Sequence, residues 1–319
     1  MGKAKSKPYV FAGSASVGLA KEICKYLKVP PGGLETKHFS DGETWIKINE
    51  NVRGSDVYVI QSTSTPANEN LMELLLIIDA LRRASAEKIN AVIPYYGYAR
   101  QDRKDQGRVA LSAKLVANLI NIAGANRVIT IDLHSGQIQG FFDIPVDHLQ
   151  AKPILVDYVK GLHLKDYVVI SPDVGYVKRA RQFAADLNAP LAIVDKRRTG
   201  HNVSEVMNII GDIEGKHAFI FDDLIDTAGT ICNAAVALIQ QGAKDVYVCC
   251  THPVFSGDAF ERISKAPLKK IIVTNTVSLR PKFKELKNLV VLSVAPLMGE
   301  VIKRIHNHQS VSVLFNEKL

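Results

Sequence analysis

The chain has 319 residues, of which 47% are hydrophobic and 23% are charged. This composition excludes wholesale disorder and suits about two domains of ordinary size. The formal net charge is +8, but there is no lysine-rich tail or long basic block. The charge therefore favours discrete pockets for small anions over a nucleic-acid groove or a membrane surface.

Targeting and cysteine signals are sparse. No apolar run is long enough to span a bilayer, and the basic start of the chain leads into a strand-like segment without a signal-peptide apolar region. The cysteines show neither metal-ligand nor redox spacing; they are Cys24, Cys232, Cys249 and Cys250. We therefore expect buried free thiols in a reducing cytoplasm.

Short, nearly continuous apolar runs recur along the chain, as in strands that are buried on both faces of a parallel sheet. In the first half, strands are predicted at Tyr9–Ala12, Asp56–Gln61, Ala91–Tyr95 and Arg127–Asp132. In the second half, they are predicted at Tyr167–Ser171, Leu191–Asp195, Ala218–Asp222, Asp245–Cys250, Ile271–Thr274 and Leu289–Ser293.

Helical spacing of apolar residues separates these strands. The predicted helices are Asn70–Ala84, Ser112–Ala123, one that starts near Pro153, Thr230–Gln241 and Pro296–His306. Alternation of strands and helices over the whole length predicts an α/β fold with parallel sheets.

The two halves of the chain resemble each other. A strand, a polar loop, a helix and a second strand occur between residues 57 and 94 and again between residues 218 and 251. Residue identity is weak, so the pattern only hints at a duplicated architecture. We place the domain boundary near Gln150, with residues 1–150 and the tail 308–319 in one domain and residues 151–307 in the other.

The most informative local motif is Phe221–Thr230, where a strand ends in Asp222 and Asp223 and a loop opens a helix. In open parallel sheets, ligands bind beyond the carboxyl ends of the strands. A helix start offers unpaired N–H groups that suit a phosphate, and Gly229 allows close backbone approach. Three aspartates and two threonines exceed what helix capping needs. The motif predicts a phosphate-cradling loop, with the two strand-end aspartates facing ribose hydroxyls or a cation.

Two other strand ends carry candidate ligands for a divalent cation. Asp132 and His134 would point the same way if their strand continued, so that a carboxylate and an imidazole could share the cation. Asp173 follows another strand, before a glycine and a helix. Each pattern also fits a structural role, namely a capped turn for Asp132 and His134 and an N-cap for Asp173.

Basic loops follow two further strands. Lys196–Arg198 opens a glycine-containing loop that suits a flap over phosphates, because phosphoryl transfer needs its charge neutralised. Tyr96–Arg108 mixes both signs of charge and suits a nucleotide phosphate or an interface. Both segments also fit solvated surface loops. No Walker loop, nucleophile-elbow serine or paired-cysteine motif is present, so an ATP site in this chain must be built without a Walker loop.

Taken together, these residues resemble ribose-phosphate diphosphokinase, also called phosphoribosyl pyrophosphate synthetase, of the phosphate-activated class. Asp132–Asp147 looks like the family signature, and the similarity covers nearly the whole chain. Other stretches that agree with the family are Asn70–Leu75, Ala91–Pro94, Tyr98–Asp102 and Thr251–Gly257. The resemblance implies two similar domains of the type I phosphoribosyltransferase kind, each with a mainly parallel sheet flanked by helices.

The resemblance also implies a reaction, the transfer of the diphosphate of ATP to the 1-hydroxyl of ribose 5-phosphate, with Mg²⁺ as cofactor. By family pattern, ribose 5-phosphate would be held by Asp222, Asp223, Asp226, Thr227, Ala228, Gly229 and Thr230. ATP would be bound by Phe39, Asp41, Glu43, Arg100, Gln101, Asp105 and His134. The metal would be held by His134, Asp173 and Asp132. The transferred diphosphate would be stabilised by Lys196 and Arg198.

Assembly and regulation follow from the same resemblance. The family builds its ATP site across a subunit interface, which implies a homo-oligomer, commonly a hexamer. A regulatory phosphate site is matched in part, which weakly implies inorganic phosphate and ADP as effectors; its residues would be Arg53, Arg108, Ser310, Ser312 and Phe315. Two positions depart from the family pattern. Tyr176 stands where relatives carry a second glycine, and Thr199 where bacterial relatives often carry proline.

Three alternatives remain open. A phosphoribosyltransferase would share the phosphate loop but consume phosphoribosyl diphosphate instead of making it. A non-catalytic regulatory relative would keep the fold but lose catalytic positions, whereas Lys196, Arg198 and Asp226 are present. Nucleic-acid binding is motivated only by the net charge.

Overall fold

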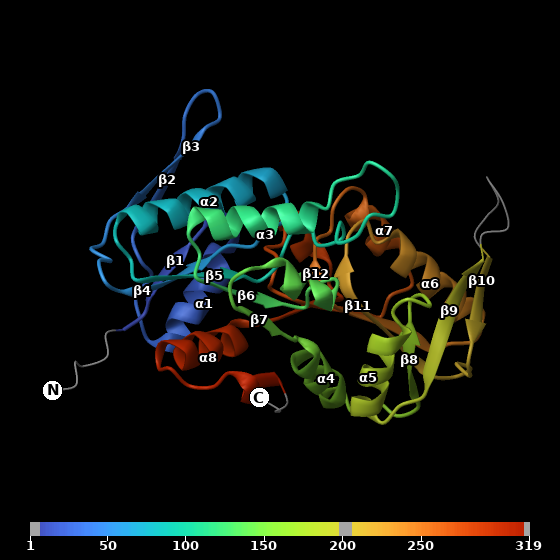
Figure 1. Ribbon diagram of the computed structural model, residues 1–319. Helices are drawn as coiled ribbons and strands as arrows, with labels where there is room; N and C mark the ends of the chain where they lie inside the picture. The colour runs from blue at the N-terminus through green and yellow to red at the C-terminus, as the bar shows by residue number, and fades with distance from the viewer. Residues whose placement is uncertain (1–6, 198–205, 316–319) are drawn as a thin grey trace. The chain divides into compact units, whose positions relative to one another are not determined.

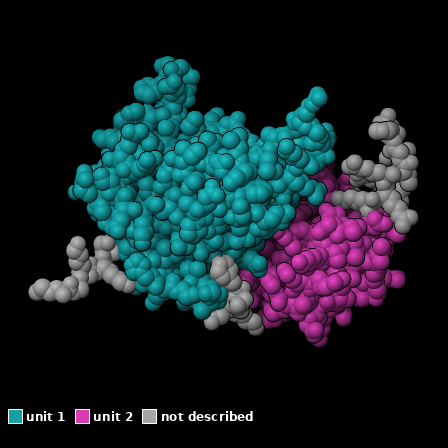
Figure 2. Space-filling model, viewed as in Figure 1, with its two compact units in different colours: residues 1–150, 276–278, 293–319 teal, residues 151–275, 279–292 magenta. Residues whose placement is uncertain are grey.

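The computed structural model describes residues 7–197 and 206–315. By internal contacts, the chain divides into two compact units. Unit 1 contains residues 1–150, 276–278 and 293–319, and unit 2 contains residues 151–275 and 279–292 (Figure 2).

Unit 1 is a parallel sheet of five strands in the order β1-β4-β5-β6-β7. Its strands are β1 (Tyr9–Ala12), β4 (Asp56–Ile60), β5 (Lys88–Ile93), β6 (Arg127–Ile131) and β7 (Val146–Leu149). A separate antiparallel hairpin pairs β2 (Leu34–His38) with β3 (Thr44–Ile48). The α-helices are α1 (Val17–Leu27), α2 (Ala67–Arg83), α3 (Ser112–Ala123) and α8 (Ala295–His306), and the short 3-10 helices are Ser14–Ser16, Gly136–Phe141 and Ser312–Phe315.

Figure 1 shows α2 and α3 side by side on one face of this sheet and α1 with α8 on the other. The α2–α3 face buries a continuous apolar core that includes Phe11, Val59, Leu74 and Ile78. This burial explains why the predicted strands of the sheet are nearly continuous in apolar residues.

Unit 2 has a seven-stranded sheet in the order β10-β9-β8-β11-β12-β13-β14, in which only β10 runs antiparallel to its neighbour. Its strands are β8 (Tyr167–Ser171), β9 (Leu191–Arg197), β10 (Val206–Ile210), β11 (His217–Ile225), β12 (Asp245–Pro253), β13 (Lys270–Thr274) and β14 (Leu289–Leu292). Its helices are α4 (Lys152–Gly161), α5 (Val177–Leu187), α6 (Gly229–Gln240), α7 (Ala259–Lys265) and the 3-10 turn Pro281–Glu285. The α4–α5 side and the α6–α7 side each cover a core of their own.

The two units repeat one topology. In both, a first strand is followed by a helix, a two-stranded hairpin and a second strand, and three more parallel strands then complete the core sheet. The hairpin differs. In unit 2, β9 pairs with β8 and extends the sheet, whereas β2 and β3 pair only with each other. The predicted α/β class with two similar, mainly parallel sheets is confirmed.

Helix α8 shows where the contact-based division differs from the domain limits expected from sequence. We expected residues 151–307 to form the second domain, but residues 293–319 belong to unit 1, because α8 packs on α1. The Tyr26 hydroxyl donates to Glu300 at 2.9 Å. A Cβ at Gly299 would lie 2.4 Å from the Tyr26 ring. In the repeated topology α4 is the counterpart of α8, and it packs on α5 in unit 2.

Two expectations about the chain's surface and thiols can be compared with the structure. Among the described residues, no helix has both the length and the apolar character needed to cross a membrane. The cysteines are all free and buried, as predicted.

Candidate functional site

The carboxyl end of β11 carries the predicted phosphate loop, within unit 2. The strand runs three residues further than expected, to Ile225, so Asp222 and Asp223 lie inside it and not at its end. Helix α6 then starts at Gly229, and its first i to i+4 hydrogen bond runs from the Cys232 N–H to the Ala228 carbonyl. The N–H groups from Ala228 to Ile231 therefore lack partners within the helix. The helix start thus offers a cluster of donors to an anion.

The loop has a backbone shape that suits a cradle. Ala228 has φ +61°, in the left-handed region that disfavours side chains with a Cβ. Thr227 and Thr230 are exposed and Ala228 is buried, so both threonine side chains are accessible to a ligand while the alanine methyl is packed. The structure thus brings Asp226–Thr230 together as one turn that leads into the start of α6.

Asp222 and Asp223 form a tight pair beneath this loop. The Asp223 N–H donates to Asp222 Oδ1 at 2.9 Å, and Arg179 of α5 lies 3.9 Å from Asp223 Oδ2. Burial raises the pKa of Asp222 well above its usual range, and the charges of Asp223 and then Asp173 raise it further. A pair with this electrostatic strain gains from hydroxyl donors or from a cation.

Asp173 lies in the loop that follows β8. Its Oδ1 accepts the Tyr176 N–H at 2.8 Å, and the Ser171 hydroxyl donates to its backbone carbonyl at 2.7 Å. The side chain is exposed. It therefore both shapes the turn before α5, as the structural alternative expected, and keeps an oxygen that can face a ligand.

Lys196 lies in β9, opposite Met207 of β10 in the antiparallel register. Arg198, the second predicted catalytic residue, lies outside the described residues, and so does Thr199. The structure therefore places the start of the predicted flap at the outer strand pair of the unit 2 sheet.

In unit 1, Asp132 and His134 follow β6 immediately. The strand does not continue through them as the sequence argument assumed, because β6 ends at Ile131 and Asp132 adopts φ +39°. The Asp132 N–H donates to Leu149 O at 3.0 Å and the Leu133 N–H donates to His148 Nε2 at 2.8 Å. Neighbouring β7 thus fixes the turn, with His134 exposed and Asp132 half-buried.

The predicted ATP residues fall into two further segments of unit 1. The first group forms the tip of the β2–β3 hairpin, where the Phe39 N–H donates to Glu43 O at 2.8 Å and the Glu43 N–H donates to Asp41 Oδ1 at 3.1 Å. The Phe39 ring is 56% exposed, so it is free to stack on a ligand. Gly42, with φ +94°, makes the turn.

The second group lies in the exposed loop between β5 and α3 and comprises Arg100, Gln101 and Asp105. Gln101 is held in place, since its Oε1 accepts the Ser112 hydroxyl at 2.5 Å. The hairpin tip and this loop lie at separate places on unit 1 (Figure 1). One copy of unit 1 therefore does not gather the two groups into a single pocket.

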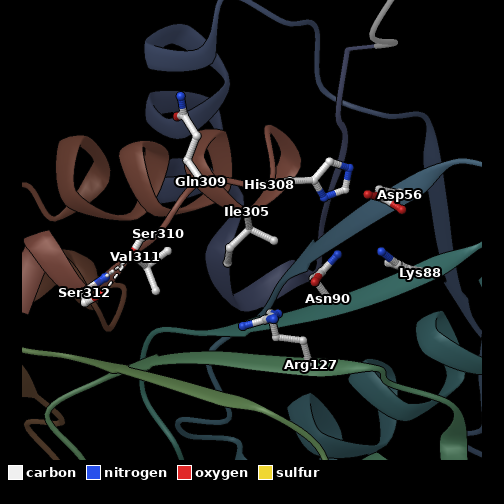
Figure 3. Close-up of a pocket in the computed structure, with 10 residues that line it drawn as sticks. All are labelled: Asp56, Lys88, Asn90, Arg127, Ile305, His308, Gln309, Ser310, Val311 and Ser312. Carbon is white, nitrogen blue, oxygen red and sulfur yellow. Dashed lines mark hydrogen bonds between the residues drawn. The ribbon is translucent and has the colours of Figure 1, made fainter. Parts of the chain in front are cut away.

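The predicted regulatory residues are only partly brought together. Ser310 and Ser312 hydrogen-bond to each other at 2.5 Å and line a cavity of about 420 Å³. Figure 3 shows Lys88, Asn90 and Arg127 projecting toward this segment from the strands. Because Asp56, Lys88 and Arg127 begin their strands, the cavity lies at the amino ends of the sheet. Arg53 and Arg108 are exposed elsewhere on unit 1 and do not line it, and nothing is described of the Phe315 side chain.

Metal ligands do not gather into a cluster within residues 7–197 and 206–315, where no group of three or more His, Cys, Asp or Glu side chains could hold an ion. Asp132 and His134 belong to unit 1 and Asp173 to unit 2. Any ion held by these residues would need further ligands, such as water or phosphate oxygens.

Sequence reasoning missed the residues that support the phosphate loop. Arg262 of α7 donates to Thr227 O at 3.0 Å, and the Ser256 hydroxyl donates to the Asp226 carboxylate. The only signal in the sequence was the family resemblance of Thr251–Gly257, which includes Ser256 but assigns it no role.

The fold and this loop together define a class: a two-unit α/β protein with an exposed strand-to-helix turn at the carboxyl end of a parallel strand. Comparison with known proteins narrows the class. Residues 9–124 match the model of the N-terminal domain of ribose phosphate pyrophosphokinase, and residues 198–316 match that of the phosphoribosyl synthetase-associated domain.

Individual relatives agree with the family models. The ribose-phosphate pyrophosphokinase of Corynebacterium ammoniagenes is 58% identical over 307 residues, which are 96% of this chain and 96% of the relative. That of Bacillus subtilis is 56% identical over 307 residues, with the same coverage of both chains. A crystal structure of phosphoribosylpyrophosphate synthetase from Mycobacterium smegmatis superposes with a TM-score of 0.89 at 42% identity, covering 95% of this chain and 100% of that one. The chain belongs to the ribose-phosphate pyrophosphokinase family.

Proposed function

We propose that this chain carries out the reaction for which its family is named, transfer of the diphosphate of ATP to ribose 5-phosphate. The 1-hydroxyl oxygen of the sugar bonds to the β-phosphorus and loses its proton. The bond from that phosphorus to the α,β-bridging oxygen breaks, and AMP leaves. The observation that carries the proposal is the open anion cradle Asp226–Thr230, in a chain related to these enzymes over nearly its full length.

The cradle would hold the 5-phosphate end of the acceptor sugar. Backbone N–H groups at the start of α6 and the hydroxyls of Thr227 and Thr230 donate to the phosphate oxygens. Asp222 and Asp223, which lie in β11 just before this loop, would accept hydrogen bonds from the ribose hydroxyls. Holding the sugar at both points fixes the 1-hydroxyl for in-line attack, and positioning of this kind accounts for much of such a rate enhancement.

ATP would be bound by Phe39, Asp41 and Glu43 of the hairpin tip together with Arg100, Gln101 and Asp105 of the β5–α3 loop. The exposed Phe39 ring suits an adenine base. Since these groups lie apart on one copy, a complete site needs a hairpin from one subunit and a loop from another. A homo-oligomer, with the hexamer as the expected form, follows from this arrangement.

Mg²⁺ would be held by His134 and Asp173, with Asp132 nearby. Few protein ligands would be needed, because Mg²⁺ usually keeps several waters and takes one or two carboxylates plus substrate phosphates. The ion would neutralise charge on the transferred diphosphate. Lys196 and Arg198 would add positive charge from the β9–β10 flap.

Phosphate activation and ADP inhibition belong to the same proposal. Ser310 and Ser312 line a cavity with Asp56, Lys88 and Arg127. Arg127 pairs with Asp147 at 2.5 Å, so Lys88 and the two hydroxyls are the groups offered to an anionic effector. Residues Arg53, Arg108 and Phe315 would complete that site in the assembled protein. Free buried thiols fit a reducing cytoplasm as the place of work.

The direct test incubates the purified chain with ATP, ribose 5-phosphate and Mg²⁺ and measures AMP. Formation of equal amounts of AMP and phosphoribosyl diphosphate is expected, and no AMP formation would exclude the proposal. Release of diphosphate from phosphoribosyl diphosphate and a nucleobase, without AMP formation, would instead favour a phosphoribosyltransferase.

Lys196→Ala tests the chemistry separately from binding. Turnover should fall by orders of magnitude, about 10²-fold or more, because one preorganised charge at the transition state is lost. Binding of ribose 5-phosphate, measured by calorimetry, should survive. Unchanged turnover would remove Lys196 from the mechanism. Lys216→Ala, in the turn just before β11 and away from the flap, is the matched control.

A further inference from the structure

Arg262 of α7 contacts the phosphate loop from behind. Its Nη1 donates to the Thr227 carbonyl at 3.0 Å, and a Cβ built on Gly229 would lie 3.3 Å from the same nitrogen. Nη2 lies 3.6 Å from Asp258, one turn earlier on the chain, and the Arg262 side chain is 43% exposed. The guanidinium therefore spans the turn that opens α6.

The position of this contact fixes the direction of a neighbouring donor. A trans peptide is planar, and its C=O and N–H point in opposite directions. A donor that holds the Thr227 carbonyl therefore turns the Ala228 N–H away from the guanidinium, to the other side of the loop. A cation on the carbonyl also polarises the peptide, which makes that N–H a better donor. Arg262 thus acts on an anion in the cradle through a peptide group and not by contact.

The loop needs support of this kind, because its conformation is strained. Ala228 holds φ +61°, in the left-handed region that is unfavourable for a residue with a Cβ. Hydrogen bonds from outside the turn can hold this conformation only if the groups that make them stand on rigid elements. Arg262 stands on a helix whose Ala259 and Ile263 are buried in the unit 2 core.

A second set of hydrogen bonds to the phosphate loop comes from the loop after β12. The Ser256 hydroxyl donates to Asp226 Oδ1, and the Ser256 N–H donates to the Asp226 carbonyl at 3.0 Å. Gly257, with φ +51°, faces the methyl of Thr227, from which a Cβ built on this glycine would lie 3.9 Å away. Asp226 would repel a phosphate, and this bonding gives its carboxylate a structural partner instead.

The charge of Arg262 also reaches the first turn of α6. Burial raises the pKa of Cys232 to about 11, and Arg262 opposes this rise. The positive guanidinium therefore adds to the field that the helix start already presents to an anion.

We propose that Arg262 is a positioning residue for the 5-phosphate of the acceptor sugar, which orients the Ala228 N–H and holds the cradle in its strained form. The inference rests on the proposed function, because it assumes that ribose 5-phosphate occupies the cradle. It assigns a role to α7, a helix that carries none of the residues matched to the family's sites.

The test compares Arg262→Met and Arg262→Lys with Lys265→Met, a control that removes a charge from the last turn of the same helix. AMP formation is measured with each substrate varied in turn. Arg262→Met should raise the KM for ribose 5-phosphate about tenfold, as expected for loss of a charged hydrogen bond, and leave the KM for ATP unchanged. Arg262→Lys keeps the charge but not the planar fork. Its KM for ribose 5-phosphate should therefore lie between those of the wild type and Arg262→Met. The control should match the wild type.

The outcomes separate the two proposals. If the wild-type chain forms no AMP, the proposed function fails, whatever the variants do. If it forms AMP and both variants keep the wild-type KM for ribose 5-phosphate, Arg262 has no positioning role. Equal increases in both KM values, or a fall in kcat alone, would also overturn the inference. If Arg262→Met does not fold, as judged by circular dichroism, Arg262→Lys decides, with an increase of about threefold expected.

Discussion

The two units contain the same strand-to-helix turn, but it is exposed to solvent in one unit and buried in the other. In unit 2, the β11–α6 turn is open, with Thr227 and Thr230 exposed. In unit 1, the β4–α2 turn is closed, because Gln61, Ser62 and Thr63 are no more than 1% exposed. The same topology therefore leaves this turn exposed in unit 2, where we propose that it binds a phosphate, and buries it in unit 1.

The closed turn is filled by its own side chains. Gln61 donates to Glu73 at 2.6 Å and accepts the Ala15 N–H at 3.1 Å. The Ser62 N–H donates to the Ser16 hydroxyl at 2.9 Å. Pro66, before α2, has no N–H to offer. The polar groups that could bind a ligand in unit 1 are thus already paired, and the difference between the repeats lies in side chains and not in topology.

The largest effect is expected at Glu73, the buried carboxylate that organises the closed turn. It accepts the Ser14 hydroxyl at 2.5 Å, the Thr36 hydroxyl at 3.1 Å and the Gln61 amide. Glu73→Ala leaves these donors unpaired and should lower the free energy of unfolding by about 3 kcal/mol. Urea unfolding followed by the fluorescence of Trp45, the single tryptophan, measures the loss in unit 1.

Glu69→Ala is the matched control, because Glu69 is exposed on the same helix. It should change stability by no more than about 0.5 kcal/mol. If Glu73→Ala costs no more than this control, the closed turn does not depend on its buried carboxylate.

A paired substitution sharpens the comparison between the two turns. Thr227→Val removes an exposed hydroxyl and should raise the KM for ribose 5-phosphate about tenfold with little change in stability. Thr63→Val removes the acceptor of the buried Gly97 N–H, which lies at 2.7 Å, and should cost about 1–3 kcal/mol of stability with no change in KM. Steady-state kinetics and urea unfolding on both variants provide the check. A KM effect in Thr63→Val would contradict a purely structural role for the closed turn.

Local patterns could be predicted where the determinants are local. Strand β1 and helix α3 have the bounds expected from sequence, because buried strands and amphipathic helices show in composition and spacing. The β2–β3 hairpin was not predicted, because polar residues interrupt its apolar ones and β3 packs on α2 instead of lying buried within the sheet. Strand β7 has four residues, of which Asp147 and His148 are polar, and it gives no apolar run.

The residues of the candidate site also divide into those that a local pattern predicts and those that only tertiary packing brings together. The phosphate loop is continuous in sequence, so a strand, a glycine and a helix start were enough to find it. Arg262 lies 35 residues beyond Thr227, which it contacts, and only the packing of α7 brings the two together. The membership of α8 in unit 1 was missed for a similar reason, because its partner α1 lies near the other end of the chain.

A third prediction concerns the pH dependence of the open turn. The raised pKa of Asp222 means that the folded chain keeps a proton that the unfolded chain releases near its usual pKa of about 3.9. The contribution of Asp222 to stability is therefore greatest below that pH and is lost as the pH rises through the folded-state pKa. Asp222→Asn, which does not titrate, should melt at a higher temperature than the wild type at pH 8 and by a smaller margin at pH 5.

The same substitution should weaken ribose 5-phosphate binding, because an acceptor for the sugar hydroxyls is lost. A gain in stability with a loss in binding is the trade-off expected of a functional carboxylate. Asp157→Asn, at an exposed position of α4, controls for the general effect of removing a charge. If the difference in melting temperature between Asp222→Asn and the wild type is the same at pH 5 and pH 8, Asp222 is not protonated in the folded chain.

The smallest effect is expected deep in the two sheets, where the repeats differ by one hydroxyl. Tyr58 of β4 is fully buried, and its hydroxyl has no hydrogen-bond partner in the described part of the chain. The matching position of β11 holds Phe219, which is also fully buried. Tyr58→Phe makes the two repeats alike and should stabilise unit 1 by about 1 kcal/mol, since an unpaired buried hydroxyl is removed without loss of ring packing. The reverse change, Phe219→Tyr, should destabilise unit 2 by a similar amount. A loss of stability in Tyr58→Phe would contradict the prediction and would mean that the Tyr58 hydroxyl is hydrogen-bonded in solution, for example to water.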